Sequence, residues 1–91
     1  MELVLITSAF CGACARTRGN VIAAMPFLPN ATFTEFDVAR NPDEAEALDI
    51  GFTPTLIVRD SAGKEVFRAS GVPTVPQVLA AAAKGLPDSG E

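Results

Sequence analysis

The sequence has no histidine and only two cysteines, and both facts limit the chemistry that it can support. A structural zinc site draws its tetrahedral set of ligands mostly from cysteine and histidine. Zinc would therefore require ligands from a second chain or an unusual set of carboxylates. We predict no metal site.

Long apolar runs and clusters of basic residues are also missing. No stretch of about 18 apolar residues is present, so we expect no membrane-spanning helix. The chain carries 7 Lys and Arg against 11 Asp and Glu, which gives a formal net charge of -4. Because no stretch gathers the basic residues into a stripe that would bind phosphate groups, we expect no nucleic-acid partner.

The 91 residues suffice for one small domain and are too few for two independent cores. We expect the domain over residues 1–86 and a flexible tail over residues 87–91. The start, "MELVLITSAF", is apolar but short and lacks a positively charged leading region. We therefore expect an unprocessed cytoplasmic protein. In that reducing compartment a close cysteine pair is more often catalytic or metal-binding than a permanent crosslink.

The first half of the chain has a strand, helix, strand pattern. Residues 3–6 form a continuous apolar run, which is typical of a strand buried on both faces. Helical spacing of apolar residues predicts a helix from residue 11 or 12 to about residue 25, with a bend near Gly19. "ATFTEFDVA", residues 31–39, is rich in Thr, Phe and Val and predicts a second strand.

The second half predicts a short helix, a β-hairpin and a final helix. In "PDEAEALDI", residues 42–50, a proline suits the first turn and acidic residues complement the positive end of the helix dipole. "TPTLIVRD" and "EVFRAS" flank the turn "SAGK" as the two strands of a hairpin. Thr74 and Gln77 have capping-box spacing and begin a helix that runs to about Lys84.

These elements give the order β-α-β-α-β-β-α. We expect the strands that helices join to run parallel, and the hairpin strands to run antiparallel. The sequence therefore predicts an α/β fold with a four-stranded mixed sheet flanked by helices.

Cys11 and Cys14, in "FCGAC", follow the first predicted strand directly and open the first helix. As a crosslink the pair is weak, because the chain-entropy estimate for so short a loop is about 2 kcal/mol, against about 4.7 kcal/mol for a loop of about 100 residues. Two inert cysteines on a helix remain an alternative. Because a CxxC pair near a βαβ pattern indicates redox chemistry, we interpret the pair as a thiol–disulfide site.

The place of the pair suits that chemistry. Unpaired amides and the positive dipole end at a helix start favour the thiolate of Cys11, and Cys14 lies one turn later, within reach. A thiol with a pKa of about 8.5 is only about 3% ionised at pH 7, whereas a pKa of about 7 makes it about half ionised. Arg16 and Arg18 are placed to add to this effect, and we interpret at least one of them as an ordinary solvated helix charge.

With the CxxC motif, its βαβ context and the later Thr53-Pro54 pair, the chain resembles the thioredoxin superfamily from about residue 2 to 85. Its length is similar to that of glutaredoxin-sized or minimal members, which lack the leading strand and helix of full thioredoxins. "FCGAC" is similar to the thioredoxin motif "WCGPC". "DVARNPDEAEALDIGFTPTLIV" resembles the family's stretch from the second strand to the cis-proline strand.

This resemblance implies a role for several residues. Cys11 corresponds to the nucleophile, Cys14 to the resolving cysteine, and Pro54 to a cis-proline that packs against the pair. Thr53 would hold an extended substrate through its backbone, and Gly71 resembles the glycine that lets a partner approach. A proline that merely opens an edge strand, and a glycine that merely ends one, remain the alternatives for these two positions.

We also expect a substrate groove beside these residues. Its expected lining is Phe10, Gly12, Phe52 and Val72.

The sequence departs from the family pattern at informative places. Thioredoxins carry a buried aspartate six residues before the nucleophile, where this chain has Leu5. Gly19 stands where many thioredoxins have a kinking proline. Ala13 replaces the motif proline, which leaves the reduction potential open between about -270 mV for thioredoxin and about -200 to -230 mV for glutaredoxins. "SGVPT" stands where glutaredoxins usually show a Gly-Gly and acidic pattern for glutathione.

We predict a thiol–disulfide oxidoreductase that reduces protein disulfides through the Cys11/Cys14 dithiol, with no cofactor besides its own redox-active disulfide. The expected partners are disulfide-containing proteins and a reductase or glutathione for regeneration, and the expected state is a monomer. The alternatives are a glutathione-linked, glutaredoxin-like enzyme and a non-catalytic binding module or redox sensor with the same fold.

Overall fold

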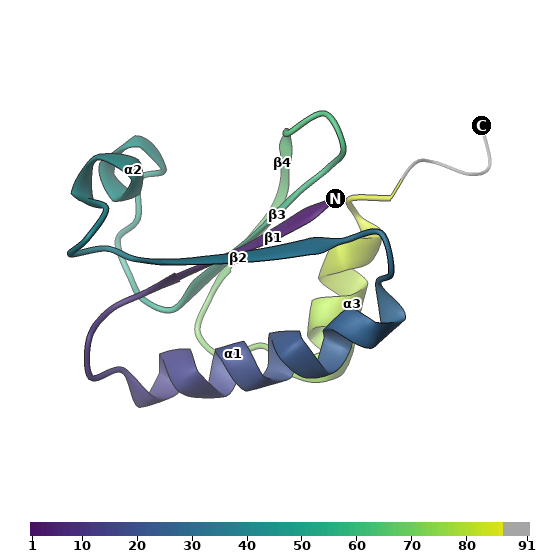
Figure 1. Ribbon diagram of the computed structural model, residues 1–91, viewed down its shortest axis with the longest axis horizontal. Helices are drawn as coiled ribbons and strands as arrows, with labels where there is room; N and C mark the ends of the chain where they lie inside the picture. Colours follow the sequence, from purple (N-terminus) through teal and green to yellow (C-terminus); the bar gives the residue numbers. More distant parts are fainter. Residues whose placement is uncertain (87–91) are drawn as a thin grey trace.

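A computed structural model describes residues 1–86 of the chain. The predicted tail, residues 87–91, lies outside these described residues. The order of elements is the predicted one (Figure 1). The elements are β1 (Glu2–Thr7), α1 (Gly12–Ala24), the 3-10 turn η1 (Met25–Phe27), β2 (Thr32–Asp37), α2 (Pro42–Ala47), β3 (Thr55–Arg59), β4 (Glu65–Ser70) and α3 (Val75–Ala83).

The sheet is four-stranded and mixed, with the spatial order β2-β1-β3-β4. β1 runs parallel to β2, in a register that pairs Leu5 with Glu35. β1 runs antiparallel to β3, and their pairing ends at Ile6 opposite Thr55. β3 and β4 form the predicted antiparallel hairpin. The predicted fold class is therefore confirmed.

One part of the predicted topology is wrong. We expected every pair of strands joined by a helix to run parallel, but β3, which follows α2, runs antiparallel to β1. The six residues of α2 span only about 9 Å, which is far short of the roughly 20 Å length of a six-residue strand. α2 lies at one end of the sheet (Figure 1), so the chain enters β3 from the end at which β2 stops.

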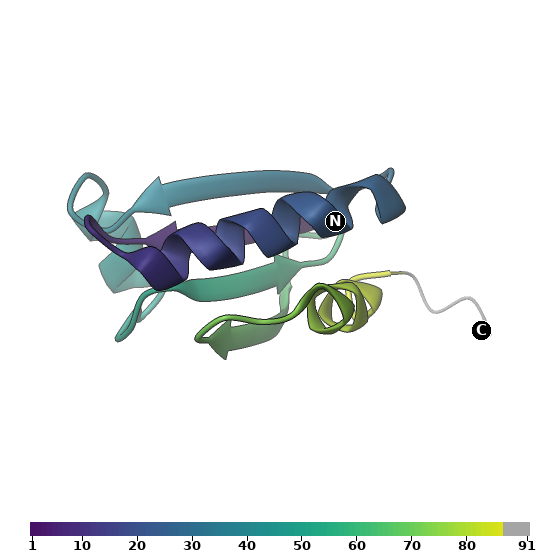
Figure 2. The same ribbon diagram turned by 90° about the horizontal axis from the view of Figure 1, so that it is seen from below.

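The main core lies under two helices. α1 and α3 pack against one another and cover the same face of the sheet (Figure 2). The buried residues of this core are Leu3, Val21, Ala24, Leu56, Val58, Val78 and Ala81. A smaller cluster on the opposite face is built from Val4, Ile6 and Ile57. β1 contributes to both clusters, so the prediction of a strand buried on both faces is confirmed.

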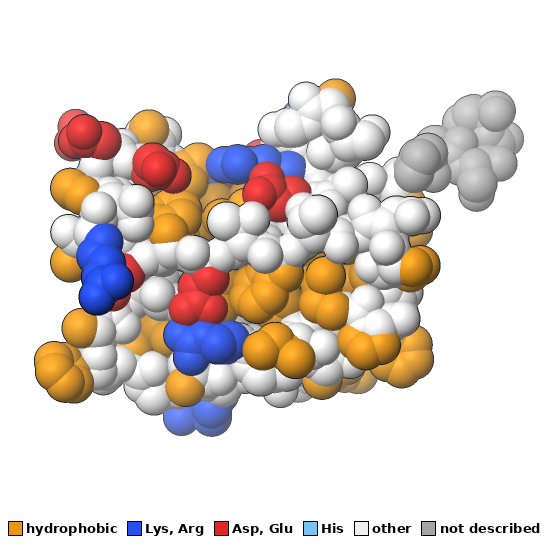
Figure 3. Space-filling view, viewed as in Figure 1, with side chains coloured by type: hydrophobic (Ala, Val, Ile, Leu, Met, Phe, Trp, Pro, Cys, Tyr) orange, Lys and Arg blue, Asp and Glu red, His pale blue; other side chains and the backbone are white. Residues whose placement is uncertain are grey.

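Beyond the smaller cluster, ion pairs cover the opposite face. Arg59 of β3 forms an ion pair with Glu2 of β1, with 3.4 Å between the guanidinium nitrogen and the carboxylate oxygen. Arg68 makes a two-point contact with Glu65 and also donates to the backbone oxygen of Leu48 at 2.6 Å. The hydrogen bonds from Arg68 lower the pKa of Glu65. Acidic and basic side chains are interspersed on the visible surface in Figure 3.

Side-chain hydrogen bonds hold the start of α3 and connect it to α1. The predicted capping box of α3 is present, because the Thr74 hydroxyl accepts from the Gln77 amide and the Gln77 side chain accepts from the Thr74 amide. The Asn20 side chain donates to the oxygen of Pro73 at 2.8 Å and so ties α1 to the start of α3. α1 is continuous through Gly19. No helix within residues 1–86 is long and apolar enough to cross a bilayer.

Gly19→Ala should raise the free energy of unfolding by about 0.5–1 kcal/mol, because alanine loses less backbone freedom in a helix. A methyl group at Gly19 would meet no heavy atom within 4 Å. Urea unfolding followed by circular dichroism measures the change, since the chain has no tryptophan or tyrosine to report by fluorescence.

Gly85→Ala is the contrasting variant. Its methyl group would lie 3.2 Å from side-chain carbons of Met1 and Val58, so we expect a loss of stability. If Gly19→Ala also lowered the stability, the predicted gain would be contradicted. The result would mean that α1 depends on glycine at this position.

Candidate active site

Cys11 sits at the point where the loop after β1 becomes the first turn of α1. Its backbone is extended, with φ -107° and ψ 99°, and its Sγ accepts a hydrogen bond from the amide of Cys14 at 3.0 Å. A sulfur atom thus takes the place that a serine or aspartate oxygen usually has at a helix start. One free amide of the first turn of α1, that of Cys14, is therefore directed at the sulfur of Cys11.

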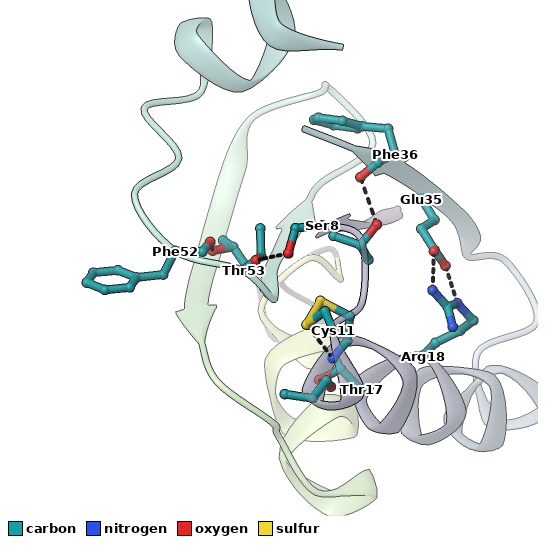
Figure 4. Close-up of a disulfide and its surroundings, with 12 residues drawn as sticks. Ser8, Cys11, Thr17, Arg18, Glu35, Phe36, Phe52 and Thr53 are labelled. Atoms are coloured by element: carbon teal, nitrogen blue, oxygen red, sulfur yellow. Dashed lines mark hydrogen bonds and ion pairs between the residues drawn. A yellow bond between two sulfur atoms is a disulfide. The ribbon is translucent and has the colours of Figure 1, made fainter. Parts of the chain in front are cut away.

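A disulfide joins Cys11 to Cys14, with a Cα–Cα separation of 5.2 Å (Figure 4). The two cysteines are not equivalent. Cys14 is buried, with 1% of its surface exposed, whereas Cys11 is partly exposed. Any group that approaches the disulfide from solvent therefore reaches the sulfur of Cys11 first.

The two arginines of the motif have different surroundings. Arg18 makes a two-point contact with Glu35 of β2, at 2.7 and 2.6 Å, and these hydrogen bonds raise the pKa of Arg18 (Figure 4). Its charge is therefore compensated. A guanidinium nitrogen of Arg16 lies 3.7 Å from the point where a Cβ on Gly12 would stand, so Arg16 is the cation beside the first turn of α1.

The Thr53–Pro54 peptide bond is cis, as predicted. Pro54 is buried, and its oxygen accepts a hydrogen bond from the amide of Gly71 at 3.2 Å. Gly71 has φ of 94°, a backbone conformation that favours glycine, and open space surrounds its α-carbon. Pro54 and Gly71 are therefore neighbours.

Ser8 is a residue that the sequence analysis missed. Its hydroxyl lies 2.7 Å from the hydroxyl of Thr53, so the loop before Cys11 is joined to the loop before Pro54 (Figure 4). The only signal in the sequence is a serine that directly follows a buried strand, and many serines in that position have no further partner.

All four of the expected groove residues are exposed. The exposed fractions are 107% for Phe10, 74% for Phe52 and 38% for Val72, and Gly12 is exposed as well. The ring of Phe52 points away from the disulfide in Figure 4. Val72 lies on a cavity of about 410 Å³ between β4 and α3. A shared groove therefore stays a prediction.

No family model matches the sequence, and no curated protein matches it. The structure, in contrast, is similar to many solved ones. Thioredoxin 1 of the thermophilic eubacterium Thermosipho africanus has a TM-score of 0.82 at 18% identity, over 100% of both chains. Fasciola hepatica thioredoxin has a TM-score of 0.79 at 24% identity, over 93% of this chain and 80% of that one. Oxidised thioredoxin of Plasmodium falciparum has a TM-score of 0.78 at 20% identity, over 91% and 78%.

The chain has the thioredoxin fold. Cys11 and Cys14 stand at the start of its first helix, and Pro54 opens the third strand with a cis bond. The position of Leu5 is the clearest departure from the resemblance, because this side chain is completely buried where an aspartate was expected.

Apart from Cys14, no buried side chain among residues 1–86 is ionisable, and the buried polar residues are all threonines. Within residues 1–86 these are Thr7, Thr17 and Thr55. Thr17, one turn after Cys14, donates its hydroxyl proton to the oxygen of Ala13 at 2.9 Å. Within residues 1–86, no buried carboxylate is therefore present to take the proton that Cys14 loses.

Arg16→Ala should slow alkylation of reduced Cys11 by the neutral reagent iodoacetamide about twofold at pH 7. The reason is that a cation beside the first turn of α1 favours the thiolate. The rate is measured by mass spectrometry of quenched samples.

Arg18→Ala is the matched control, and it should leave the alkylation rate unchanged because Glu35 already compensates that charge. An equal effect of both substitutions would contradict the assignment of Arg16 as the nearby cation.

Proposed function

We propose that the protein is a thiol–disulfide oxidoreductase that reduces protein disulfides through Cys11 and Cys14. One observation carries the proposal: the paired cysteines open a helix, and only Cys11 is accessible to solvent. Burial disfavours a charged thiolate, whereas the amide that points at Cys11 favours one. Cys11 is therefore the attacking group and Cys14 the resolving group.

The reaction begins with both cysteines reduced. The thiolate of Cys11 attacks one sulfur of a substrate disulfide, the substrate bond breaks, and its other sulfur leaves as a thiolate that takes a proton from water. Cys14 then loses its proton to water and attacks the sulfur of Cys11, and the substrate sulfur that leaves takes up a proton from water. The bond between Cys11 and the substrate breaks, so the substrate gains two electrons in total and the protein keeps the Cys11–Cys14 disulfide.

The backbone beside Pro54 supports a peptide rather than a small molecule as the substrate. Within residues 1–86, no hydrogen bond uses the amide or the carbonyl of Thr53, although its side chain is bonded to Ser8. An extended peptide that approaches Cys11 can pair with these free groups as a short added strand. The exposed Phe10, Phe52 and Val72 offer apolar contacts around it.

A separate reductant must then restore the dithiol. We propose a reductase or glutathione for this step, in the cytoplasm, with the protein acting as a monomer and without any cofactor besides its own cysteines. Rapid reduction of the oxidised protein by glutathione would favour the glutaredoxin-like alternative. Re-reduction by a thioredoxin-reductase type of partner would favour the thioredoxin-like one.

Cys14→Ser should accumulate a mixed disulfide between Cys11 and oxidised insulin, because the group that resolves this intermediate is gone. Cys11→Ser should form none, because the remaining thiol is buried. Mass spectrometry of acid-quenched mixtures measures the adduct, and both variants should lose steady-state reduction of insulin.

Equal trapping by the two variants, or by neither, would overturn these roles. Binding of a partner protein that persists in Cys11→Ser, together with no reduction of insulin by the unmodified protein, would instead support a binding module.

A further inference from the structure

The ladder between β1 and β3 stops just before the active site. Its last pair is Ile6 opposite Thr55, in an antiparallel register. Extending this register by two residues in each strand brings Ser8 opposite Thr53. Pro54 interrupts the backbone pairing at this point, because proline has no amide hydrogen to donate.

A hydrogen bond between two side chains joins the two loops beyond the end of the backbone ladder. The hydroxyls of Ser8 and Thr53 lie 2.7 Å apart, two register positions beyond the last backbone pair. The backbone amide and carbonyl of Thr53 make no hydrogen bond to any residue within 1–86. They are therefore available to pair with a substrate strand.

The other bonds near the site do not make the same connection. Thr55 donates its hydroxyl proton to the oxygen of Phe52 at 2.6 Å, within one loop. Thr7 donates to the oxygen of Phe36 on β2, and the amide of Gly71 donates to Pro54 from the end of β4. Within residues 1–86, the bond between Ser8 and Thr53 is thus the side-chain hydrogen bond that joins the loop of Cys11 to the loop of the cis-proline.

We propose that the hydroxyl bridge between Ser8 and Thr53 is a positioning device that fixes the spacing between the attacking sulfur of Cys11 and the peptide-binding backbone of Thr53. The inference rests on the proposed function. A substrate peptide must satisfy both points at once, since its sulfur meets Cys11 while its backbone pairs with Thr53. A small disulfide touches Cys11 alone, so the bridge makes the site selective for extended peptide disulfides.

The test measures single-turnover oxidation of the pre-reduced protein by two disulfides. Oxidised insulin engages both points, and bis(2-hydroxyethyl) disulfide engages Cys11 only. Ser8→Ala and Thr53→Val should each raise the half-saturating concentration of insulin about three- to tenfold, the loss expected for one hydrogen bond. The double variant should lose no more than either single variant, and Thr53→Ser, which keeps the hydroxyl, should behave as the unmodified protein does.

Thr55→Val is the matched control, because it removes a hydroxyl bond in the same loop that does not cross to Ser8. Adding Ser8→Ala to Thr55→Val should produce the full loss that Ser8→Ala causes alone. The rate with the small disulfide should stay unchanged in Ser8→Ala and in Thr55→Val, once each rate is corrected for any unfolded fraction.

Two results would overturn the proposal while leaving the proposed function intact: unchanged insulin kinetics in Ser8→Ala, or an equal loss with both disulfides. Losses that multiply in the Ser8→Ala/Thr53→Val variant would overturn it as well, since they would show two independent contributions. Failure of the unmodified protein to reduce either disulfide would overturn the proposed function, and this proposal with it.

Discussion

The structure depends on the burial of β1 on both faces and along both edges. Its apolar side chains enter the core under α1 and α3 and also the smaller cluster on the opposite face, while β2 and β3 pair with its two edges. A strand held on four sides cannot shift its register without moving its side chains to the wrong face. The loop that follows β1 therefore starts from a fixed point, and Cys11 meets α1 at a fixed place.

The features that the sequence could predict are those whose residues lie only a few positions apart in the chain. The apolar run of β1, the CxxC spacing and the capping box at Thr74 each depend on residues a few positions apart, and the structure bears them out. The direction of β3 depends instead on whether α2 is long enough to cross the sheet. The partners of Ser8 and Arg18 lie 45 and 17 residues away, so only the folded chain reveals them.

Small size shapes the second face of the sheet. The pairs Glu2–Arg59 and Glu65–Arg68 lie on the face of the sheet opposite α1 and α3. Exposed ion pairs add little stability, typically no more than about 1 kcal/mol each. These pairs keep polar the part of this face that lies beside the small cluster of Val4, Ile6 and Ile57.

The hydrogen bond from the amide of Cys14 to the sulfur of Cys11 would link the stability of α1 to the proposed redox cycle. A charged thiolate accepts a hydrogen bond more strongly than a neutral sulfur does. The first turn of α1 is therefore held by its cap more firmly when Cys11 is a thiolate, and by the covalent bridge when the pair is oxidised. In the proposed cycle the same turn would thus be held in both the reduced and the oxidised form, and it would be least restrained while a substrate occupies the Cys11 sulfur.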